Sequence, residues 1–263
     1  MKLLTLNCHS WQEADQWKKL DILAAVIHEQ SYDVVALQEV SQSITAEMVK
    51  GKLKANNFGF LLVQKLKELG SMYDYEWDIS HIGYECFEEG VALLTKHPVL
   101  QRESFFVSCS QDTSYWKTRK VVGMTVNYKG ISTAFYACHL GWWQDEEEPF
   151  RSQMDRLVAR INHERPHFLM GDFNNPAGIA GEGYDYVQDF GYFDTYQLAK
   201  HKDSGVTVLG EIAGWENHSD KKRIDFIFSS KKVEILTSRV ILNGINKPVV
   251  SDHFAIEVNV ADW

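Results

Sequence analysis

Polar side chains come directly after several apolar segments of the chain, where a strand would give way to a turn. They are acids, amides and histidines, namely Asn7, Gln38, Glu39, His139, Asp172, Asn174, Asp252 and His253. Any one of them is more often a turn residue that hydrogen-bonds its own backbone. If the segments are strands whose ends meet at one edge, the clustered carboxylates would repel one another without a cation. The set therefore predicts a metal site.

Oxygen donors dominate the acidic part of this set, and no cysteine belongs to it. Mg²⁺ or Mn²⁺ therefore fits better than Zn²⁺. Because magnesium in proteins often joins one or two carboxylates to a substrate phosphate, the set favours phosphoryl chemistry. The metal would neutralise the phosphorus oxygens while a carboxylate or histidine directs water in line. The sequence contains no G-x-S-x-G elbow, Walker loop or G-x-G-x-x-G fingerprint that would indicate another chemistry.

Short apolar segments rich in β-branched and aromatic residues predict strands along the whole chain. The clearest are Leu3–Leu6, Val34–Leu37, Val91–Leu94, Val121–Tyr128, Ser132–Cys138, Phe168–Met170, Ile224–Phe228 and Ala255–Val260. Weaker strand signals lie around Phe60, Tyr75, Phe105, Val206 and Val233. Gly, Asn, Asp and Pro separate the segments, as is typical of turns.

Residues typical of helix N-termini predict two helices. Ser10 and Glu13 match a capping box, and apolar residues then recur at helical spacing. Pro149 suits the first turn of a second helix, and the acidic run 145–148 before it is interpreted as a solvated helix start. Because the helices are scattered among more numerous strands, we expect packed sheets with helices on their outer faces.

The composition limits the classes of function. The 263 residues include 27 Lys+Arg and 36 Asp+Glu, a formal net charge of −9. This balance argues against an extended basic surface for nucleic acid, although it permits a small basic pocket. The sequence contains no secretory signal and no apolar run long enough to span a membrane. Its four cysteines do not have the spacing of a zinc site or of a redox pair. We expect a soluble cytoplasmic protein with reduced thiols, and one domain spanning residues 1–263.

Motif blocks in a fixed order resemble the endonuclease/exonuclease/phosphatase superfamily of metal-dependent phosphoesterases. The blocks cover nearly the whole chain and are Leu6-Asn7, Leu37-Gln38-Glu39-Val40, Glu89-Gly90-Val91-Ala92-Leu93-Leu94, Arg119, Cys138-His139-Leu140, Gly171-Asp172-Phe173-Asn174, Arg223-Ile224-Asp225-Phe226-Ile227 and Ser251-Asp252-His253-Phe254. GDFN combined with a late SDH is their most specific part. The resemblance implies an α+β fold, a four-layer α/β/β/α sandwich of two packed, mostly antiparallel sheets flanked by helices.

The resemblance also implies a metal shell. Glu39 would be the principal Mg²⁺ ligand, and Asn7 and Asp252 would complete or support the shell. One departure from the superfamily pattern is visible, because some nuclease members have a carboxylate two positions after the Asn, where this chain has His9. The number of bound ions, one or two, therefore stays open.

Five further residues acquire catalytic roles through the same resemblance. Asp172 would orient or deprotonate the attacking water, and Asn174 would hydrogen-bond the phosphate. His139 and His253 would contact the phosphoryl oxygens. Asp225 would hold His253 in one orientation, as carboxylates do for functional histidines.

A narrower resemblance concerns shorter strings. MKLLTLNCHSWQE at 1–13, ALQEVSQ at 36–42 and GWW at 141–143 look like the maltose 6′-phosphate phosphatases of Gram-positive bacteria. This resemblance implies a cytoplasmic enzyme that releases maltose and inorganic phosphate.

Aromatic residues near the predicted phosphate position bear on the substrate. Trp142 and Trp143 follow His139 closely, and Trp116 precedes Arg119, which would add positive charge at the phosphate. Indole faces can cover the apolar face of a sugar, although a Trp is equally a large core residue. We therefore expect Arg119, Trp142 and Trp143 to contact a small phosphorylated sugar.

Three alternatives remain at this stage. A Mg²⁺-dependent nuclease would need a basic groove, which the net charge disfavours. A sphingomyelinase-like phosphodiesterase would need an exposed apolar hairpin and usually export. A binding protein that keeps the fold without the chemistry would not need the complete motif set. The oligomeric state is left open.

Overall fold

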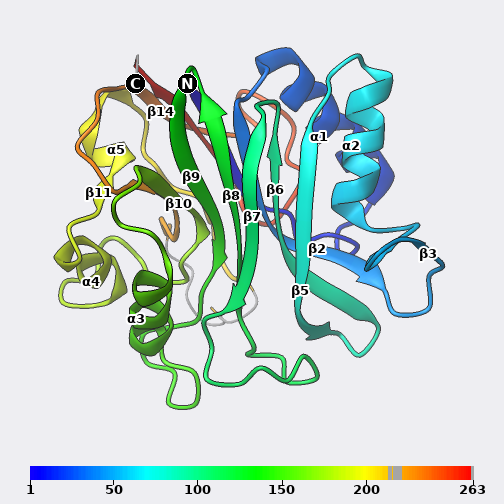
Figure 1. The fold of residues 1–263 in the computed structure, drawn as a ribbon, viewed down its shortest axis with the longest axis horizontal. Helices are drawn as coiled ribbons and strands as arrows, with labels where there is room; N and C mark the ends of the chain where they lie inside the picture. Colours follow the sequence, from blue (N-terminus) through cyan, green and yellow to red (C-terminus); the bar gives the residue numbers. More distant parts are fainter. Residues whose placement is uncertain (213–214, 216–220, 262–263) are drawn as a thin grey trace.

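Two large β-sheets pack face to face at the centre of the computed structural model, which describes residues 1–212, 215 and 221–261 (Figure 1). The seven-stranded sheet consists, in spatial order, of β12 (Ala199–Lys202), β14 (Ile235–Ile241), β15 (Ala255–Val260), β1 (Lys2–Asn7), β2 (Val34–Ser43), β6 (Phe87–Thr95) and β5 (Asp74–Gly83). The six-stranded sheet consists of β11 (Phe193–Asp194), β13 (Asp225–Ser229), β10 (His167–Asp172), β9 (Ile131–His139), β8 (Lys120–Tyr128) and β7 (Val99–Phe106). A small separate hairpin pairs β3 (Met48–Lys50) with β4 (Leu53–Lys54).

Helices cover the outer faces of both large sheets (Figure 1). The helices are α1 (Gln16–Gln30), α2 (Phe58–Glu68), α3 (Phe150–Arg160), α4 (Gly183–Asp189) and the short α5 (Thr195–Leu198). Helices α1 and α2 share an apolar cluster with the seven-stranded sheet, and α3 and α4 share another with the six-stranded sheet. Within the described part of the two sheets, only β1–β2, β9–β10 and β12–β14 pair in parallel. The four-layer sandwich of mostly antiparallel sheets is thereby confirmed.

Apolar side chains alternate between the two faces of the central strands. In β2, Val34 and Ala36 belong to the core between the sheets, whereas Val35 and Leu37 belong to the cluster with α1 and α2. Successive side chains of a strand point to opposite faces, so a strand covered on both faces is apolar throughout. This double coverage explains why the central strands are visible in the sequence as short continuous apolar segments.

The eight clearest predicted strands all correspond to observed strands, but the predictions at Phe60 and Ser10 were wrong. Phe60 lies in α2 and not in a strand, because Asn57 caps this helix by accepting a hydrogen bond from the Phe60 N–H at 2.9 Å. The capping box is also absent, since α1 begins only at Gln16 and the Ser10 hydroxyl donates to the Glu39 carbonyl oxygen.

Among the weaker strand signals, Tyr75 lies in β5 and Phe105 in β7. Val206 lies outside any named strand, and Val233 precedes β14.

The predicted second helix is confirmed, and Pro149 occupies its N-cap position. The acidic run before it is only partly solvated, which corrects the prediction. Glu148 is buried and accepts hydrogen bonds from the backbone N–H groups of Cys109 and Ser110, at 2.6 and 2.7 Å. None of the described helices is long and apolar enough to cross a membrane.

Candidate active site

Strand pairing brings the predicted site residues to one end of the sandwich. Asn7 pairs with Gln38 across the parallel β1–β2 ladder, and Asp172 pairs with His139 across the parallel β9–β10 ladder. Asp225 lies opposite Asp172 on the antiparallel neighbour β13. Figure 1 shows loops 107–119 and 140–149 at the end of the sandwich opposite the two chain termini. The convergence of strand ends inferred from the sequence is therefore present.

A cavity of about 520 Å³ opens at this end. Its lining contains most of the predicted residues, namely Glu39, Arg119, His139, Trp142, Asp172, Asn174, Asp252 and His253. It also contains Trp116, one of the three tryptophans considered as substrate contacts. The remaining lining residues, to which no role was assigned from the sequence, are His9, His81, Gly83, Tyr84, Glu89 and Ile212.

Asp172 lies at the centre of a hydrogen-bonded group. The Asn174 backbone N–H donates to its Oδ1 at 2.8 Å, and the Asn7 side-chain amide donates to its Oδ2 at 3.2 Å. The ring Nε2 atoms of His139 and His253 each lie 3.8 Å from the same Oδ2. A water or phosphoryl oxygen held by these histidines would thus be close to the carboxylate.

The two histidines differ in charge. Burial alone would lower the pKa of His253, but Asp225 and Asp172 raise that pKa to about 10. Asp225 accepts at 2.9 Å from Nδ1 of His253 and so fixes the ring, as predicted for this pair. Burial and the positive Arg119 hold the pKa of His139 well below its usual value. His253 is therefore cationic at neutral pH and His139 is neutral.

Burial and the neighbouring Asp225 raise the pKa of Asp172 to about 7. A carboxyl group with a pKa near the working pH can both accept and release a proton, which is the property that general acid–base catalysis requires. Perturbed carboxyl groups in clefts are candidates for functional sites. The position of Asp172 in the cavity supports a proton-transfer role.

A bulge in β2 directs Glu39 into the cavity. The pairing of β2 with β6 shifts register between Leu37 and Val40, and Glu39 has a φ of 51°. Bulges re-aim side chains next to active sites. The Asn7 amide donates to Glu39 Oε1 at 2.8 Å, so Asn7 contacts both Glu39 and Asp172.

The acidic side chains of the cavity fit a divalent cation. Burial and Asp252 raise the pKa of Glu39, and burial and Glu39 raise the pKa of Glu89 to about 8. Burial is the larger cause of both shifts and a neighbouring carboxylate adds to it, so a cation bound here would favour the charged forms. Ligand-type atoms of Glu39, Glu89 and His139 lie within 4.8 Å of one another. Oxygen atoms predominate, as in Mg²⁺ and Mn²⁺ sites.

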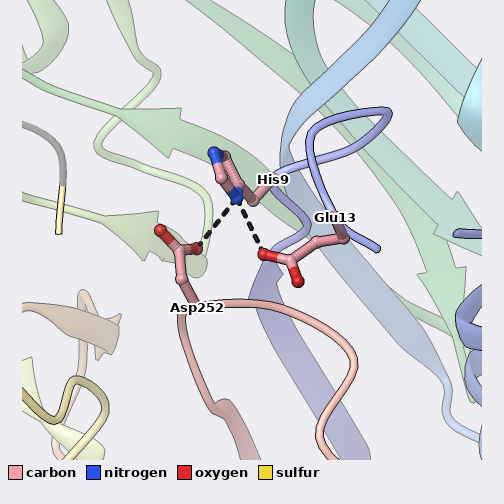
Figure 2. A group of neighbouring side chains, drawn as sticks. All are labelled: His9, Glu13 and Asp252. Atoms are coloured by element: carbon pink, nitrogen blue, oxygen red, sulfur yellow. Dashed lines mark hydrogen bonds and ion pairs between the residues drawn. The ribbon is translucent and has the colours of Figure 1, made fainter. Parts of the chain in front are cut away.

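Asp252 belongs to a second group of side chains, shown in Figure 2. The Nδ1 atom of His9 lies 2.8 Å from Glu13 Oε1 and 3.7 Å from Asp252 Oδ1. Glu13 also pairs with Lys19. His9 occupies the place where some family members have a carboxylate, so the spacing after Asn7 was the available sequence signal for it.

Arg119 is buried and lines the cavity. Its Nη1 donates to the carbonyl oxygens of Trp116 and Thr118 at 2.9 and 3.3 Å, while its Nε has no hydrogen-bond partner among the described residues. A guanidinium in the cavity lining supplies positive charge that attracts an anion. The predicted contact of Arg119 with phosphate is consistent with this arrangement.

The adjacent residues Trp142 and Trp143 lie in different surroundings. Trp142 lines the cavity, and its ring lies 6.1 Å from that of Trp116. Trp143 is absent from the cavity lining and packs against Phe150 and Tyr186 at ring distances of 6.3 and 5.6 Å. The predicted substrate contact by Trp143 is therefore not supported, because its ring belongs to the core beside α3.

His81 and Glu89 face each other on the paired strands β5 and β6. His81 Nε2 lies 3.3 Å from Glu89 Oε1, and both residues are buried. Burial and Arg119 lower the pKa of His81 to about 3, so this ring is neutral. Glu89 begins the motif block Glu89-Gly90-Val91-Ala92-Leu93-Leu94. Its position in the cavity lining depends on the β5–β6 register, which the sequence alone does not reveal.

The sequence matches the Endonuclease/Exonuclease/phosphatase family over residues 6–253. The chain belongs to this family. Its members are phosphoester hydrolases that generally depend on a divalent metal, so the protein is a phosphoesterase in broad class. No curated protein matches the sequence.

Several solved structures superpose on the whole chain. An endonuclease/exonuclease/phosphatase family protein from Leptotrichia buccalis C-1013-b is 38% identical, with a TM-score of 0.94 and 100% of each chain covered. A functionally unknown protein from Enterococcus faecalis V583 is 19% identical, with a TM-score of 0.73 and 100% of each chain covered. The mannosyl-6-phosphatase Bt3783 of Bacteroides thetaiotaomicron VPI-5482 is 16% identical, with a TM-score of 0.68 and 100% of each chain covered.

Proposed function

We propose that this family member is a phosphomonoesterase that hydrolyses a phosphorylated sugar by in-line attack of water. The observation that carries the proposal is the scarcity of basic residues in the cavity wall. Among its described lining residues, Arg119 is the single Lys or Arg, and with the cationic His253 it stands against the acidic residues Glu39, Glu89, Asp172 and Asp252. A nuclease needs a basic track for the phosphate backbone, whereas one phosphate can be bound by one Arg and a metal.

The site residues divide the work as follows. Asp172 orients or deprotonates the attacking water, and Asn174 hydrogen-bonds the phosphate. The neutral His139 and the cationic His253 contact phosphoryl oxygens, and Asp225 keeps His253 charged and oriented. Arg119 supplies further positive charge.

Glu39 and Asp252, with Asn7, would hold the metal. We propose Mg²⁺, with Mn²⁺ as the substitute, because the donors are mainly oxygen atoms. When bound, the ion would neutralise charge on the phosphoryl oxygens. The Asn7 amide N–H groups hold Glu39 and Asp172 in place.

Maltose 6′-phosphate is the proposed substrate, and the cytoplasm is the proposed location. The aromatic side chains Trp116 and Trp142 in the cavity support a sugar leaving group, because ligand pockets combine aromatic walls with few polar groups. The buried thiols Cys8 and Cys138 are free and consistent with a reducing compartment. Because one of the similar structures is named a mannosyl-6-phosphatase, mannose phosphates are further substrates to test.

Hydrolysis of a panel of esters tests the proposal. Phosphate release is measured for maltose 6′-phosphate, hexose 6-phosphates and nucleotides, and strand cleavage is measured for oligonucleotides, because cutting a phosphodiester releases no inorganic phosphate. Each substrate is assayed with Mg²⁺ and with a chelator. We expect release from sugar phosphates with Mg²⁺ and none with the chelator. Preference for an oligonucleotide, or activity that survives chelation, would refute the proposal.

A further inference from the structure

The hairpin between β5 and β6 presents a tyrosine to the cavity in an unusual backbone conformation. Tyr84 lines the cavity, its residue surface is 57% exposed, and its φ is 51°. The next residue, Glu85, has a φ of 59° and is exposed, but it does not line the cavity. The Cys86 N–H donates to the Gly83 carbonyl oxygen at 3.2 Å, so Tyr84 and Glu85 are the two central residues of the hairpin turn, where positive φ angles are required.

Contacts on two sides hold this hairpin in place. The Ile44 N–H donates to the Cys86 carbonyl oxygen at 2.9 Å, which joins the turn to the segment after β2. The Ile82 N–H donates to the Thr113 carbonyl oxygen at 2.7 Å, which joins the hairpin to the loop that carries Trp116. The turn is therefore positioned relative both to the strand that carries Glu39 and to the aromatic part of the cavity.

A further polar contact anchors the hairpin to β2. The Glu88 carboxylate accepts from the Gln42 side-chain amide at 2.6 Å and lies 3.0 Å from Lys54 Nζ. A fixed hairpin can hold an aromatic ring at a defined place at little further entropic cost on binding.

Tyr84 and Trp116 are large aromatic residues that remain exposed within a concave site. Their residue surfaces are 57% and 52% exposed, and Trp142 lines the same cavity. Exposed aromatic surface in a hollow marks ligand binding. A tyrosine hydroxyl is protonated at neutral pH and can donate a hydrogen bond. An aromatic face beside a polar hydroxyl suits a sugar ring, which has an apolar C–H face and hydroxyl edges.

We propose that Tyr84 contacts the sugar ring of the substrate and makes the enzyme select carbohydrate phosphates over small phosphate esters. This inference rests on the proposed phosphomonoesterase function and names a specificity-determining residue for it. The neighbouring Glu85 supplies a matched control, because it shares the turn but not the cavity lining.

Two substrates separate ring recognition from chemistry. We expect Tyr84→Ala to raise KM for the preferred sugar phosphate about tenfold, with less than about a twofold change in kcat/KM for glycerol phosphate. Glu85→Gly, in the same turn, should leave both substrates unaffected. Tyr84→Phe, which keeps the aromatic ring, should keep KM for the sugar phosphate within about twofold of the unmodified protein. Equal losses on both substrates, or no loss in Tyr84→Ala, would overturn the proposal.

Binding of free maltose, followed by saturation-transfer NMR, tests Tyr84 without hydrolysis. We expect a signal with the unmodified protein and with Glu85→Gly, and a weaker signal with Tyr84→Ala. If no sugar phosphate is hydrolysed but maltose binds through Tyr84, the phosphatase function fails and the sugar contact stands. If sugar phosphates are hydrolysed and Tyr84→Ala binds maltose as well as the unmodified protein does, only the Tyr84 contact fails. An unmodified protein that does not bind maltose also overturns the contact.

Discussion

Asp172 has defined neighbours at both of its carboxylate oxygens. Oδ1 accepts from the Asn174 N–H, while Oδ2 accepts from Asn7 and faces the rings of His139 and His253. The burial that raises its pKa to about 7 also makes its charged form costly in the metal-free protein. Burial is therefore the common cause of the raised pKa of Asp172 and of the energetic cost of its charged form.

We expect Asp172→Asn to lower kcat by about 10²- to 10⁴-fold, because an amide cannot accept the proton of the attacking water. Phosphate release at saturating substrate measures the loss. The overall fold and substrate binding should be largely retained, as circular dichroism and calorimetry would show. Asp189→Asn, on the exposed end of α4, is the matched control and should keep full turnover. An active Asp172→Asn variant would remove Asp172 from water activation.

We expect Glu39→Gln to raise the stability of the protein and to lower its affinity for Mg²⁺. Glu39→Gln should stabilise the metal-free protein, because it removes the repulsion with Asp252 that helps to raise the pKa of Glu39. The same change should weaken Mg²⁺ binding by at least about 10- to 100-fold, the range seen when even outer partners of a metal site are lost.

Thermal unfolding with and without Mg²⁺ measures both effects of Glu39→Gln. At 100 times the Kd, Mg²⁺ should stabilise the unmodified protein by about 2.7 kcal/mol. Glu68→Gln, on the exposed end of α2, should behave like the unmodified protein. Equal stabilisation of Glu39→Gln by Mg²⁺ would exclude Glu39 as a ligand.

At the scale of elements, the parallel pair β1–β2 positions Asn7 and Glu39, and a carboxylate at its other end holds the pair together. Asp33 precedes β2 and accepts from the Lys2 N–H at 2.6 Å, and it lies 2.7 Å from His97 Nε2. Burial raises the pKa of Asp33, but the Lys2 N–H and His97 outweigh burial and lower it overall. The charged form of Asp33 therefore stabilises the folded state.

Asp33→Asn should lower the free energy of unfolding at pH 7 by about 1–2 kcal/mol, through weaker hydrogen bonds. Because the folded pKa lies below the unfolded one, the contribution is full above the ordinary Asp pKa of about 3.9. It is lost as the pH falls through the lowered folded pKa. Denaturant unfolding from pH 7 to pH 2 should therefore show the gap between variant and unmodified protein narrowing only below about pH 4. A gap that is constant over this range would contradict the assignment.

The central strands and the GDFN and SDH residues could be predicted from the sequence because burial on both strand faces leaves continuous apolar segments ending in polar residues. Helix α2 was missed because Phe58, Phe60 and Leu62 are equally compatible with a strand, and the deciding signal was the small cap Asn57. His81 and Tyr84 were missed because they reach the cavity only through the pairing of β5 with β6. Trp143 lies outside the cavity lining because neighbouring residues in a loop can point to different surroundings.

For the whole molecule, one domain over residues 1–263 remains a prediction. The core between the sheets combines strands from the start, middle and end of the chain, including β1, β9 and β15. We therefore expect a single cooperative unfolding transition, with fluorescence and circular dichroism giving coincident curves. Two separated transitions would show that the chain contains independent units.

The charge of the whole molecule and the charge of the cavity point the same way. A net charge of −9 and a cavity wall with more acids than bases disfavour long polyanions. Part of that acidic excess lies in Glu39, Asp172, Asp225 and Asp252, and a divalent cation would offset two of those charges. A small phosphate ester is the substrate class that this electrostatic arrangement suits.

The most direct measurement is the ratio of kcat/KM for maltose 6′-phosphate to kcat/KM for a single-stranded oligonucleotide, in one buffer with Mg²⁺. The proposed phosphomonoesterase predicts a ratio of at least about 10². A ratio below one would contradict it and identify the protein as a nuclease.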